Sequence, residues 1–454
     1  MQWLKDNDLL KRFSYVNGSW HSSETQFEVC NPANGELIGR VDDAGAGVAK
    51  LAIDSAKSAL SGWRTKSANQ RANLMRRWFE LMLEHQDDLA TLLTKEQGKP
   101  LAEAKGEIAY GASFIEWFAE EGKRVYGDTI PSPSADKRIL VIKQPVGVVA
   151  AITPWNFPNA MIARKAAAAL AAGCTFVVRP AAQTPLSALA MAELAERAGI
   201  PPGVFNVVVG QDAKGIGRVL TEHPDVAKFT FTGSTQVGKA LIAQCAGGVK
   251  RVSMELGGNA PFIVFDDADL DAAVAGAIAS KYRNAGQTCV CTNRIFVQNN
   301  VVQAFTDKYM AAVAKLTVGD GLQPGVTIGP MISPQAADEV RQRVHKSLAA
   351  GAKMPMGNVQ EQGAFMTPIV LTQVTNDMPI ASNEIFGPVS PIIGFEQEAD
   401  VLAMANDTEV GLAAYFYSRD IGRIWRVAEG LEYGMVGVNE GLISNAAAQF
   451  GGMK

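Results

Sequence analysis

The clearest periodicity in the first third of the chain is helical. Across residues 70–97 apolar side chains recur every three to four positions, and Gly98 and Pro100 follow directly. Because glycine and proline both interrupt helices, this pattern predicts a helix that ends at about residue 97. A similar stretch predicts a second helix over about 101–123.

Residues 128–146 differ from their surroundings, because a Pro- and Ser-rich turn is followed by an alternating, strand-like run. Four short apolar runs then begin near residues 147, 174, 204 and 228, with Ala- and Leu-rich helical patterns between them. This spacing suits right-handed crossovers between parallel strands. Alternation resumes near residue 251 and continues to about 435, so we predict an α/β fold with two α/β units and a small hairpin.

Composition narrows the class of protein. With 454 residues, the chain is long enough for roughly three domains of about 150 residues. Its net charge of −4 and lack of a dense basic stretch argue against a nucleic-acid groove. The longest weakly polar run, residues 166–178, is too short for a membrane span, and the first residues show no secretory signal.

The cysteines and histidines bear on the cellular compartment of the protein and on metal binding. Five cysteines without paired spacing indicate a reducing compartment, so we expect a cytoplasmic protein. The four scattered histidines form no familiar ligand set, so no metal site is expected. Most cysteines are predicted to be small buried hydrophobic residues, namely Cys30, Cys174 and Cys245.

Cys289 and Cys291 lie in the polar segment NAGQTCVCTNR, where a thiol can be exposed and act as a nucleophile. The spacing alone equally allows two incidental loop cysteines, or a metal-binding pair. Glu255, in SMELGGNAP, could be a general base or an ordinary paired carboxylate.

No GxGxxG fingerprint follows the first predicted parallel strand. The segment FTGSTQVG instead places Gly233 and Ser234 between a strand and a helix. Free N–H groups at a helix start favour phosphate, although a capped turn explains the same residues.

Five motifs then combine in a specific order: TPWNFP (153–158), FTGSTQVG (231–238), MELGGN (254–259), GQTC (286–289) and EIFGP (384–388). On these motifs the chain resembles the aldehyde dehydrogenase superfamily across essentially its whole length. Longer segments, such as SKYRNAGQTCVCTNR, are most similar to the succinate-semialdehyde dehydrogenases of that family.

The resemblance implies an aldehyde-dehydrogenase-like α/β fold with two Rossmann-like domains and a small oligomerisation hairpin. Residues 1–122 and 143–252 would form the dinucleotide-binding domain, with 437–454 returning to it. Residues 253–436 would form the catalytic domain and 123–142 the hairpin. Relatives continue beyond GGMK with a strand that pairs with this hairpin, so we expect an exposed edge and a weakened homodimer or homotetramer.

The resemblance also implies a mechanism. Cys289 would attack the aldehyde, while the Asn156 amide and the Cys289 backbone N–H stabilise the oxyanion. Hydride would leave for the nicotinamide, and Glu255 would activate water to hydrolyse the thioester. Cys291 stands where some relatives form a reversible disulfide with the nucleophile, and an inert thiol is the alternative here.

For the cofactor, the family places Gly233 and Ser234 at the pyrophosphate, Glu384 at the nicotinamide ribose, and Trp155 and Arg179 along the adenosine half. The remaining expected cofactor contacts are Thr153, Pro154, Ala182 and Phe386. Members that prefer NAD often carry Glu where this chain has Ala182. An arginine without that carboxylate suits a 2′-phosphate, so we expect NADP, with NAD as the alternative.

For the substrate, related semialdehyde enzymes hold a distal carboxylate at the positions of Arg164, Arg283 and Ser444. The implied reaction is oxidation of succinate semialdehyde to succinate. Another ω-semialdehyde acid, such as glutarate semialdehyde, is the rival substrate. From a different class, the chain could be a non-catalytic protein that binds dinucleotide or associates with other subunits.

Overall fold

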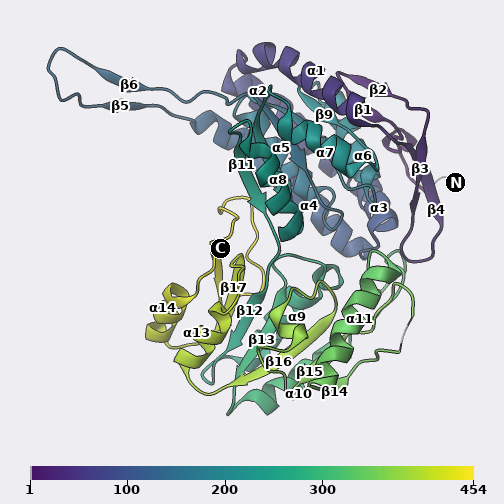
Figure 1. The fold of residues 1–454 in the computed structure, drawn as a ribbon, viewed down its shortest axis with the longest axis vertical. Helices are drawn as coiled ribbons and strands as arrows, with labels where there is room; N and C mark the ends of the chain where they lie inside the picture. The colour runs from purple at the N-terminus through teal and green to yellow at the C-terminus, as the bar shows by residue number, and fades with distance from the viewer. Residues whose placement is uncertain (1–2, 361) are drawn as a thin grey trace. The chain divides into compact units, whose positions relative to one another are not determined.

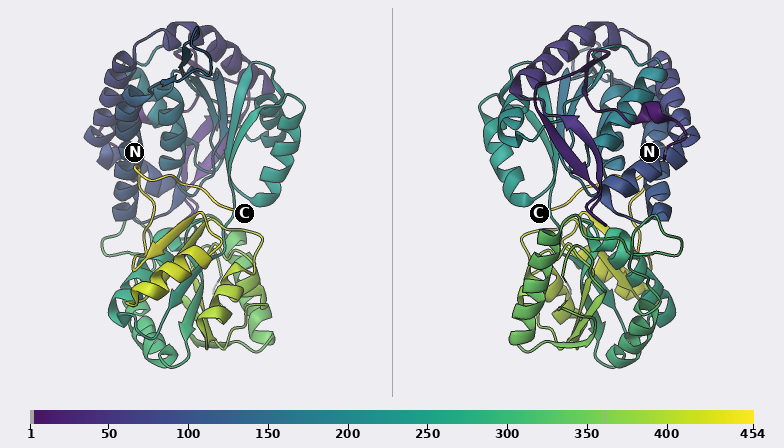
Figure 2. Two further views of the ribbon diagram at one scale, coloured as in Figure 1. Left: turned by 90° about the vertical axis from the view of Figure 1, so that its left-hand side faces the viewer. Right: turned by 90° about the vertical axis from the view of Figure 1, so that its right-hand side faces the viewer.

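A computed structural model describes residues 3–360 and 362–454, which divide into two compact units (Figures 1 and 2). The first unit contains residues 3–30, 37–96 and 104–254. The second contains residues 31–36, 97–103 and 255 onwards. The sequence interpretation put 437–454 with the dinucleotide-binding domain, whereas here Lys454 pairs with Glu432 in the second unit.

The first unit is built on a seven-stranded sheet in the order β11-β10-β7-β8-β9-β1-β2. Strands β7 to β10 are parallel neighbours, while β1 and β2 add an antiparallel edge. Its strands are β1 (Ser14–Val16), β2 (Ser19–His21), β7 (Val148–Ile152), β8 (Thr175–Arg179), β9 (Phe205–Val207), β10 (Val226–Thr232) and β11 (Arg251–Glu255). The parallel strands begin close to the four predicted positions, which confirms the α/β fold class.

Helices cover both faces of this sheet (Figure 2). As a result, β7 and β8 are buried along their whole length. On one face lie α1 (Ala46–Arg64), α7 (Ala213–Glu222) and α8 (Thr235–Ala246). The other helices of this unit are η1 (Asn7–Leu9), α2 (Ala68–Glu84), α3 (Gln86–Gln97), α4 (Leu101–Glu121), η2 (Gly122–Arg124), α5 (Ala160–Ala171) and α6 (Pro185–Arg197).

The prediction of a single helix over 70–97 is wrong, because the stretch contains two helices. The structure divides it into α2 and α3 at His85, which leaves the helical conformation and closes α2 through its backbone N–H to Leu81 O. The apolar periodicity continues across the break, so hydrophobic pattern alone could not reveal it.

Two small ribbons accompany the main sheet. In β3 (Gln26–Cys30), which pairs with β4 (Leu37–Asp42), burial alternates strictly and Cys30 falls on the outward face. The expectation that Cys30 is buried is therefore wrong, while Cys174 and Cys245 are buried as predicted. The other ribbon joins β5 (Asp128–Ile130) to β6 (Ile139–Val141), extends away from the first unit and is exposed throughout (Figure 1).

The second unit is also built on a seven-stranded sheet, in the order β14-β15-β16-β13-β12-β17-β18. All neighbours are parallel except β14, which is antiparallel to β15. The strands are β12 (Ala260–Val264), β13 (Thr292–Gln298), β14 (Lys353–Met356), β15 (Ile369–Thr372), β16 (Val389–Phe395), β17 (Ala413–Tyr417) and β18 (Met435–Val438).

Alternating residues of these strands fill two hydrophobic clusters, one on each face. Phe262 and Ile295 pack with α9 and α10, whereas Ile263 and Phe296 pack on the opposite side. The helices are α9 (Leu270–Tyr282), η3 (Arg283–Gly286), α10 (Val302–Val313), α11 (Pro334–Ala349), α12 (Pro379–Ser382), α13 (Glu398–Asn406) and α14 (Ile421–Gly430). Within the described residues, no helix combines the length and apolar character needed to cross a membrane.

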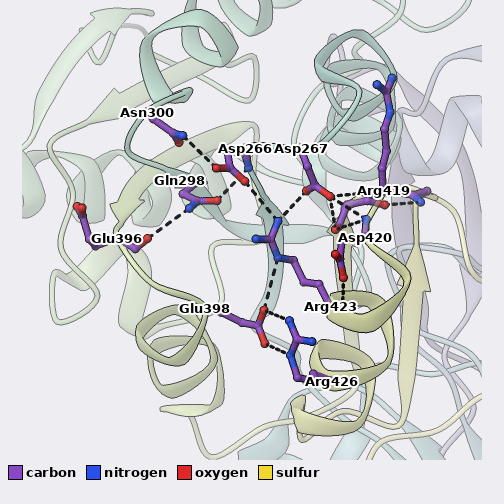
Figure 3. A network of polar contacts seen from close by, with 12 residues as sticks. Asp266, Asp267, Gln298, Asn300, Glu396, Glu398, Arg419, Asp420, Arg423 and Arg426 are labelled. Carbon is purple, nitrogen blue, oxygen red and sulfur yellow. Dashed lines mark hydrogen bonds and ion pairs between the residues drawn. The ribbon is translucent and has the colours of Figure 1, made fainter.

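A charged network fixes α13 and α14 to the carboxyl end of β12 (Figure 3). Arg423 contacts Asp267 at 2.8 Å and Glu398 at 3.5 Å, and its guanidinium lies 4.6 Å from the Phe265 ring centroid. Burial alone would raise the pKa of Asp267. Hydrogen bonds from Arg419 N, Ser418 Oγ and Asp420 N, together with the Arg423 charge, outweigh that effect and lower it.

We predict that Asp267→Asn lowers the free energy of unfolding at neutral pH by about 1–3 kcal/mol, because it weakens charge-assisted hydrogen bonds. The stabilisation from a lowered carboxyl pKa is present above the unfolded-state value and is lost as pH falls through the folded one. The difference between the two proteins in urea denaturation should therefore shrink below about pH 4.

The matched control is Asp271→Asn, which removes an exposed carboxylate paired with Lys308 and should change stability far less. A loss in Asp267→Asn that is equally large at acid and neutral pH would contradict this account.

Candidate active site

In the first unit, candidate cofactor residues gather at the carboxyl edge of the parallel sheet. Thr153 follows β7, Arg179 ends β8 and Gly233 follows β10. From β7 the chain passes to β8 and β9 on one side, and then returns to β10 on the other. Such a reversal of strand order is where open α/β sheets bind ligands.

The loop after β7 is anchored at both ends. Thr153 N donates to Arg179 O at 3.1 Å, which ties the loop to β8. At its far end, Glu107 of α4 accepts from Asn159 N at 2.9 Å and Ala160 N at 3.2 Å. These bonds hold the loop that carries the candidate oxyanion donor, Asn156, which is buried. Trp155 and Pro154 lie in the same loop.

The junction between β10 and α8 is a capped helix start. Ser234 Oγ accepts from Val237 N, and a Cβ at Gly233 would lie 2.4 Å from the Phe231 ring. The Phe231 ring thus favours glycine at position 233, where the residue is half-buried. The capped turn is observed, and the phosphate role stays a prediction that this geometry suits.

Arg179 is buried at the same edge. Its Nη2 donates to Gly210 O at 2.9 Å, and burial lowers its pKa while the charges of Asp212 and Asp43 oppose that change. A guanidinium keeps its charge at neutral pH, so this edge contains a fixed cation. Ala182, three residues later, is half-buried and contributes no carboxylate.

Arg164, a candidate substrate ligand on α5, rests against aromatic side chains of α4. Its Nη2 donates to Tyr110 Oη, and its Cζ lies 5.5 Å from the Tyr110 ring centroid and 4.7 Å from that of Phe114. Cation–π contact on this scale orients the guanidinium. The sequence interpretation missed both aromatic residues, although their i,i+4 spacing on a predicted helix could have indicated a shared face.

In the second unit, the candidate catalytic groups lie at the amino edge of the parallel sheet, not at its carboxyl edge. The Glu255 loop leads into β12, the Cys289 loop into β13 and the Glu384 loop into β16. Because these strands are parallel and lie side by side in the order β16-β13-β12, their amino ends bring the three loops together.

Gly258 joins these loops. A Cβ there would lie 2.2 Å from Cys289 O, so only glycine permits this approach. Its backbone N–H donates to Glu384 Oε1 at 3.1 Å. Burial raises the pKa of Glu384 to about 7, while the Gly258 hydrogen bond and the Arg343 and Lys281 charges oppose the rise.

The end of the chain returns to this edge. Met453 N donates to Gly411 O at 3.0 Å, and a Cβ at Gly451 would lie 4.0 Å from Glu255 Oε1. Phe386, two residues after Glu384, has a positive φ of 57°, which is strained for a bulky side chain.

The two cysteines of the CxC pair differ in environment. Cys289 is half-buried, whereas Cys291 is buried and donates from Sγ to Gly286 O at 3.3 Å. Burial raises the pKa of Cys291, so it favours the inert thiol form. Both residues are thiols in this structure, and a disulfide between them stays a hypothesis.

Arg283 and Ser444, the other candidate substrate ligands, are both half-buried. Arg283 O accepts from Thr288 Oγ1 at 3.3 Å, which places it directly beside the nucleophile segment. Ser444 follows Ile443, which packs against the cluster that Cys289 also contacts.

A possible metal-ligand group lies elsewhere, in the first unit. Ligand atoms of Asp54, His223 and Asp225 come within 4.8 Å of one another. Lys57 Nζ is 2.8 Å from Asp225 and Lys50 Nζ is 2.9 Å from Asp54, so these carboxylates are already paired. The arrangement is that of a surface ion-pair cluster.

Comparison with known proteins decides the family. Residues 20–454 match the aldehyde dehydrogenase family. The chain belongs to this family. It is an NAD(P)-dependent aldehyde dehydrogenase, which confirms the family that the five sequence motifs indicated.

Three similar proteins illustrate the match. The chain is 59% identical to a glutarate-semialdehyde dehydrogenase of Pseudomonas aeruginosa, and the match covers 99% of this chain and 94% of the relative. It is 58% identical to a succinate-semialdehyde dehydrogenase [NADP(+)] of Escherichia coli, with the same coverage. A solved succinate-semialdehyde dehydrogenase from Burkholderia pseudomallei superposes with a TM-score of 0.98 at 59% identity, covering all of this chain and 94% of that one.

We predict that Glu384→Gln stabilises this aldehyde dehydrogenase at alkaline pH. A raised folded-state pKa costs stability as pH rises from the unfolded value of about 4.3 to the folded value of about 7. The variant lacks this loss, so its advantage should grow across that window, reach up to about 3 kcal/mol and then level off.

Chemical denaturation at several pH values between 5 and 8 measures this advantage. Glu396→Gln, which alters an exposed carboxylate of the same unit, should show no such growth. An advantage for Glu384→Gln that is constant over the window would contradict the raised pKa.

Proposed function

We propose that this aldehyde dehydrogenase oxidises succinate semialdehyde to succinate with NADP through a covalent intermediate on Cys289. The observation that carries the proposal is the meeting of the Cys289, Glu255 and Glu384 loops at the amino edge of the second sheet, where Gly258 links them. A nucleophile, a carboxylate base and a second, half-buried carboxylate at one edge match the chemistry of aldehyde oxidation.

The proposed sequence begins with attack of the Cys289 thiolate on the aldehyde carbon, which gives a tetrahedral thiohemiacetal. The Asn156 side-chain amide and the Cys289 backbone N–H donate to the developing oxyanion, and one such donor is typically worth roughly 3 kcal/mol. The carbonyl then re-forms with loss of hydride, and NADP, held by the residues described below, would supply the hydride acceptor. Glu255 then takes a proton from water, which attacks the thioester and releases the acid and the thiol.

The cofactor residues support a phosphate-rich dinucleotide. The Gly233 backbone and the start of α8 would receive the pyrophosphate. Arg179 would lie along the adenosine half, where its positive charge suits a 2′-phosphate. Ala182 brings no carboxylate there that would repel this phosphate. Glu384 would accept a hydrogen bond from the nicotinamide ribose, and Thr153, Trp155 and Phe386 would line the rest of the cofactor site.

The proposed substrate class is a small aldehyde with a distal anionic group. Arg164, Arg283 and Ser444 would hold that group, and the aromatic support of Arg164 by Tyr110 and Phe114 favours a fixed clamp. The glutarate-semialdehyde dehydrogenase named above, and a 3-sulfolactaldehyde dehydrogenase of Pseudomonas putida that is 58% identical to this chain, are in keeping with an anionic substrate. Glutarate semialdehyde is the second candidate, because two arginines can serve either chain length.

Assembly and location complete the proposal. The exposed β5–β6 ribbon presents Ile130, Leu140 and Ile142 to solvent, which supports its use as a contact between copies of the chain. We expect a homodimer or homotetramer. A thiol nucleophile must stay reduced, which favours the cytoplasm.

We predict that Glu255→Gln separates the two halves of the reaction. The thiol can still attack and be acylated, but water lacks its base, so the steady-state rate should fall roughly 10²–10⁴-fold. Rapid-mixing absorbance at 340 nm should then show a burst of NADPH, close to one per subunit, before slow turnover. A variant without a burst, or with normal turnover, would argue against this role for Glu255.

We predict that Arg283→Ala weakens binding of acidic aldehydes selectively. Loss of a charge-assisted hydrogen bond should raise the KM for succinate semialdehyde about tenfold or more, while a neutral aldehyde of similar length is affected far less. The control is Arg419→Ala, which removes an exposed arginine paired with Asp269 and should leave both KM values unchanged. Equal effects on the acidic and neutral aldehydes would exclude the clamp.

A further inference from the structure

The backbone just before the nucleophile is strained. Asn284 and Ala285 have φ values of 52° and 56°, and Gly286 continues the left-handed run at 78°. Left-handed residues other than glycine are unfavourable and persist only where surrounding structure holds them. Asn284 and Ala285 are two such residues in succession, and Gly286, three residues before Cys289, extends the left-handed run without strain of its own, so the turn calls for an external restraint.

That restraint comes from a distant segment. Residues 97–103 group with the second unit although α3 and α4 around them belong mainly to the first. Gln97 Nε2 donates to Asn284 Oδ1 at 3.0 Å, and Glu103 Oε2 accepts from Asn284 N at 2.8 Å. The segment therefore holds both the side chain and the backbone of the first left-handed residue.

Gln97 is itself fixed in place. Its Oε1 accepts from Lys99 N at 3.0 Å, and its side chain is fully buried. Gly98 adopts φ 96°, where a Cβ would lie 2.7 Å from the Pro330 ring. On its other side, Glu96 accepts from Leu186 N and Ser187 N at 2.8 Å, so the backbone is anchored on both sides of position 97.

Gln287 carries the restraint forward to the nucleophile. Its Nε2 donates to Asn284 O at 3.1 Å, and its Oε1 accepts from Ile332 N at 2.9 Å. Asn284 Nδ2 in turn donates to Gln287 O at 3.3 Å. These buried bonds leave Thr288 and Cys289 directly after a turn whose shape depends on Asn284.

We propose that Gln97 is a positioning residue for the nucleophile, acting through Asn284 to keep the left-handed turn that presents the Cys289 thiol. This inference rests on the proposed role of Cys289. Without the Gln97 amide, Asn284 Oδ1 loses a buried donor and the strained turn relaxes towards ordinary backbone conformations. The thiol then moves relative to its reaction partners, whereas the cofactor residues of the first unit are unaffected.

Two variants test the proposal in a Cys30→Ser background, which removes the exposed cysteine from thiol labelling. Gln97→Leu removes the amide. Gln97→Glu keeps an acceptor for Lys99 N. It replaces the amide NH₂ that donates to Asn284 Oδ1 with a carboxylate oxygen. A displacement of about 1 Å costs on the order of 10²-fold in rate. We expect both variants to lower kcat and the rate of Cys289 alkylation by iodoacetamide at least tenfold, while the KM for NADP stays within twofold.

The matched control is Asn206→Leu, which removes another fully buried amide that bonds to Phe176 O, Gly203 O and Asn17 N in the first unit. At a similar loss in Tm it should leave Cys289 reactivity unchanged. Normal alkylation and kcat in both Gln97 variants, or equal losses in Asn206→Leu, would overturn the proposal.

Cys289→Ala in the same background distinguishes failure of the proposed nucleophile from failure of the positioning role of Gln97. Persistent activity in that variant would refute the proposed nucleophile itself. Loss of activity there, together with unimpaired Gln97 variants, would refute only the positioning role.

Discussion

The close approach of the Gly258 backbone to the Cys289 carbonyl is the contact on which the proposed chemistry of the second unit depends. A Cβ at position 258 would overlap that carbonyl, and the Gly258 N–H also donates a hydrogen bond to the Glu384 carboxylate. One residue without a side chain thus brings three loops together that are far apart in sequence. Parallel pairing of β12, β13 and β16 supplies the rest, because it aligns the starts of these strands at one edge.

Conformational strain concentrates near the candidate nucleophile, Cys289, and near Glu384. Phe386 and the turn at Asn284 both adopt left-handed backbone, and both directly adjoin candidate functional groups. Such conformations persist because buried hydrogen bonds hold them. The restraint at Asn284 comes from residues 97–103, so part of the environment of the candidate nucleophile is encoded nearly 200 positions away.

Much of the fold could be predicted from the sequence because parallel buried strands have a strong local pattern. The four apolar runs gave the positions of β7 to β10 closely. The break at His85 could not be found in this way, because α2 and α3 share one apolar periodicity. Cys30 was misjudged because neighbouring residues do not reveal which face of a two-stranded ribbon is covered. The placement of 97–103 depends on tertiary contacts alone.

The candidate site was predictable mainly through the family motifs. Spacing alone left Cys289, Glu255 and Gly233 open to ordinary structural roles, and only their combination with the other motifs pointed to one chemistry. The supporting residues were not found, because Gln97, Glu107 and Tyr110 act through contacts with distant segments. Nothing in their local sequence distinguishes them from other helical residues.

The central claim is that Cys289 carries an NADP-dependent oxidation of succinate semialdehyde. The most direct measurement is the rate of NADPH formation with this substrate in the wild-type protein and in Cys289→Ala, repeated with NAD. The account predicts turnover that is faster with NADP than with NAD and that disappears in the variant. Folded wild-type protein that forms no NADPH or NADH, or a variant that retains activity, would contradict it.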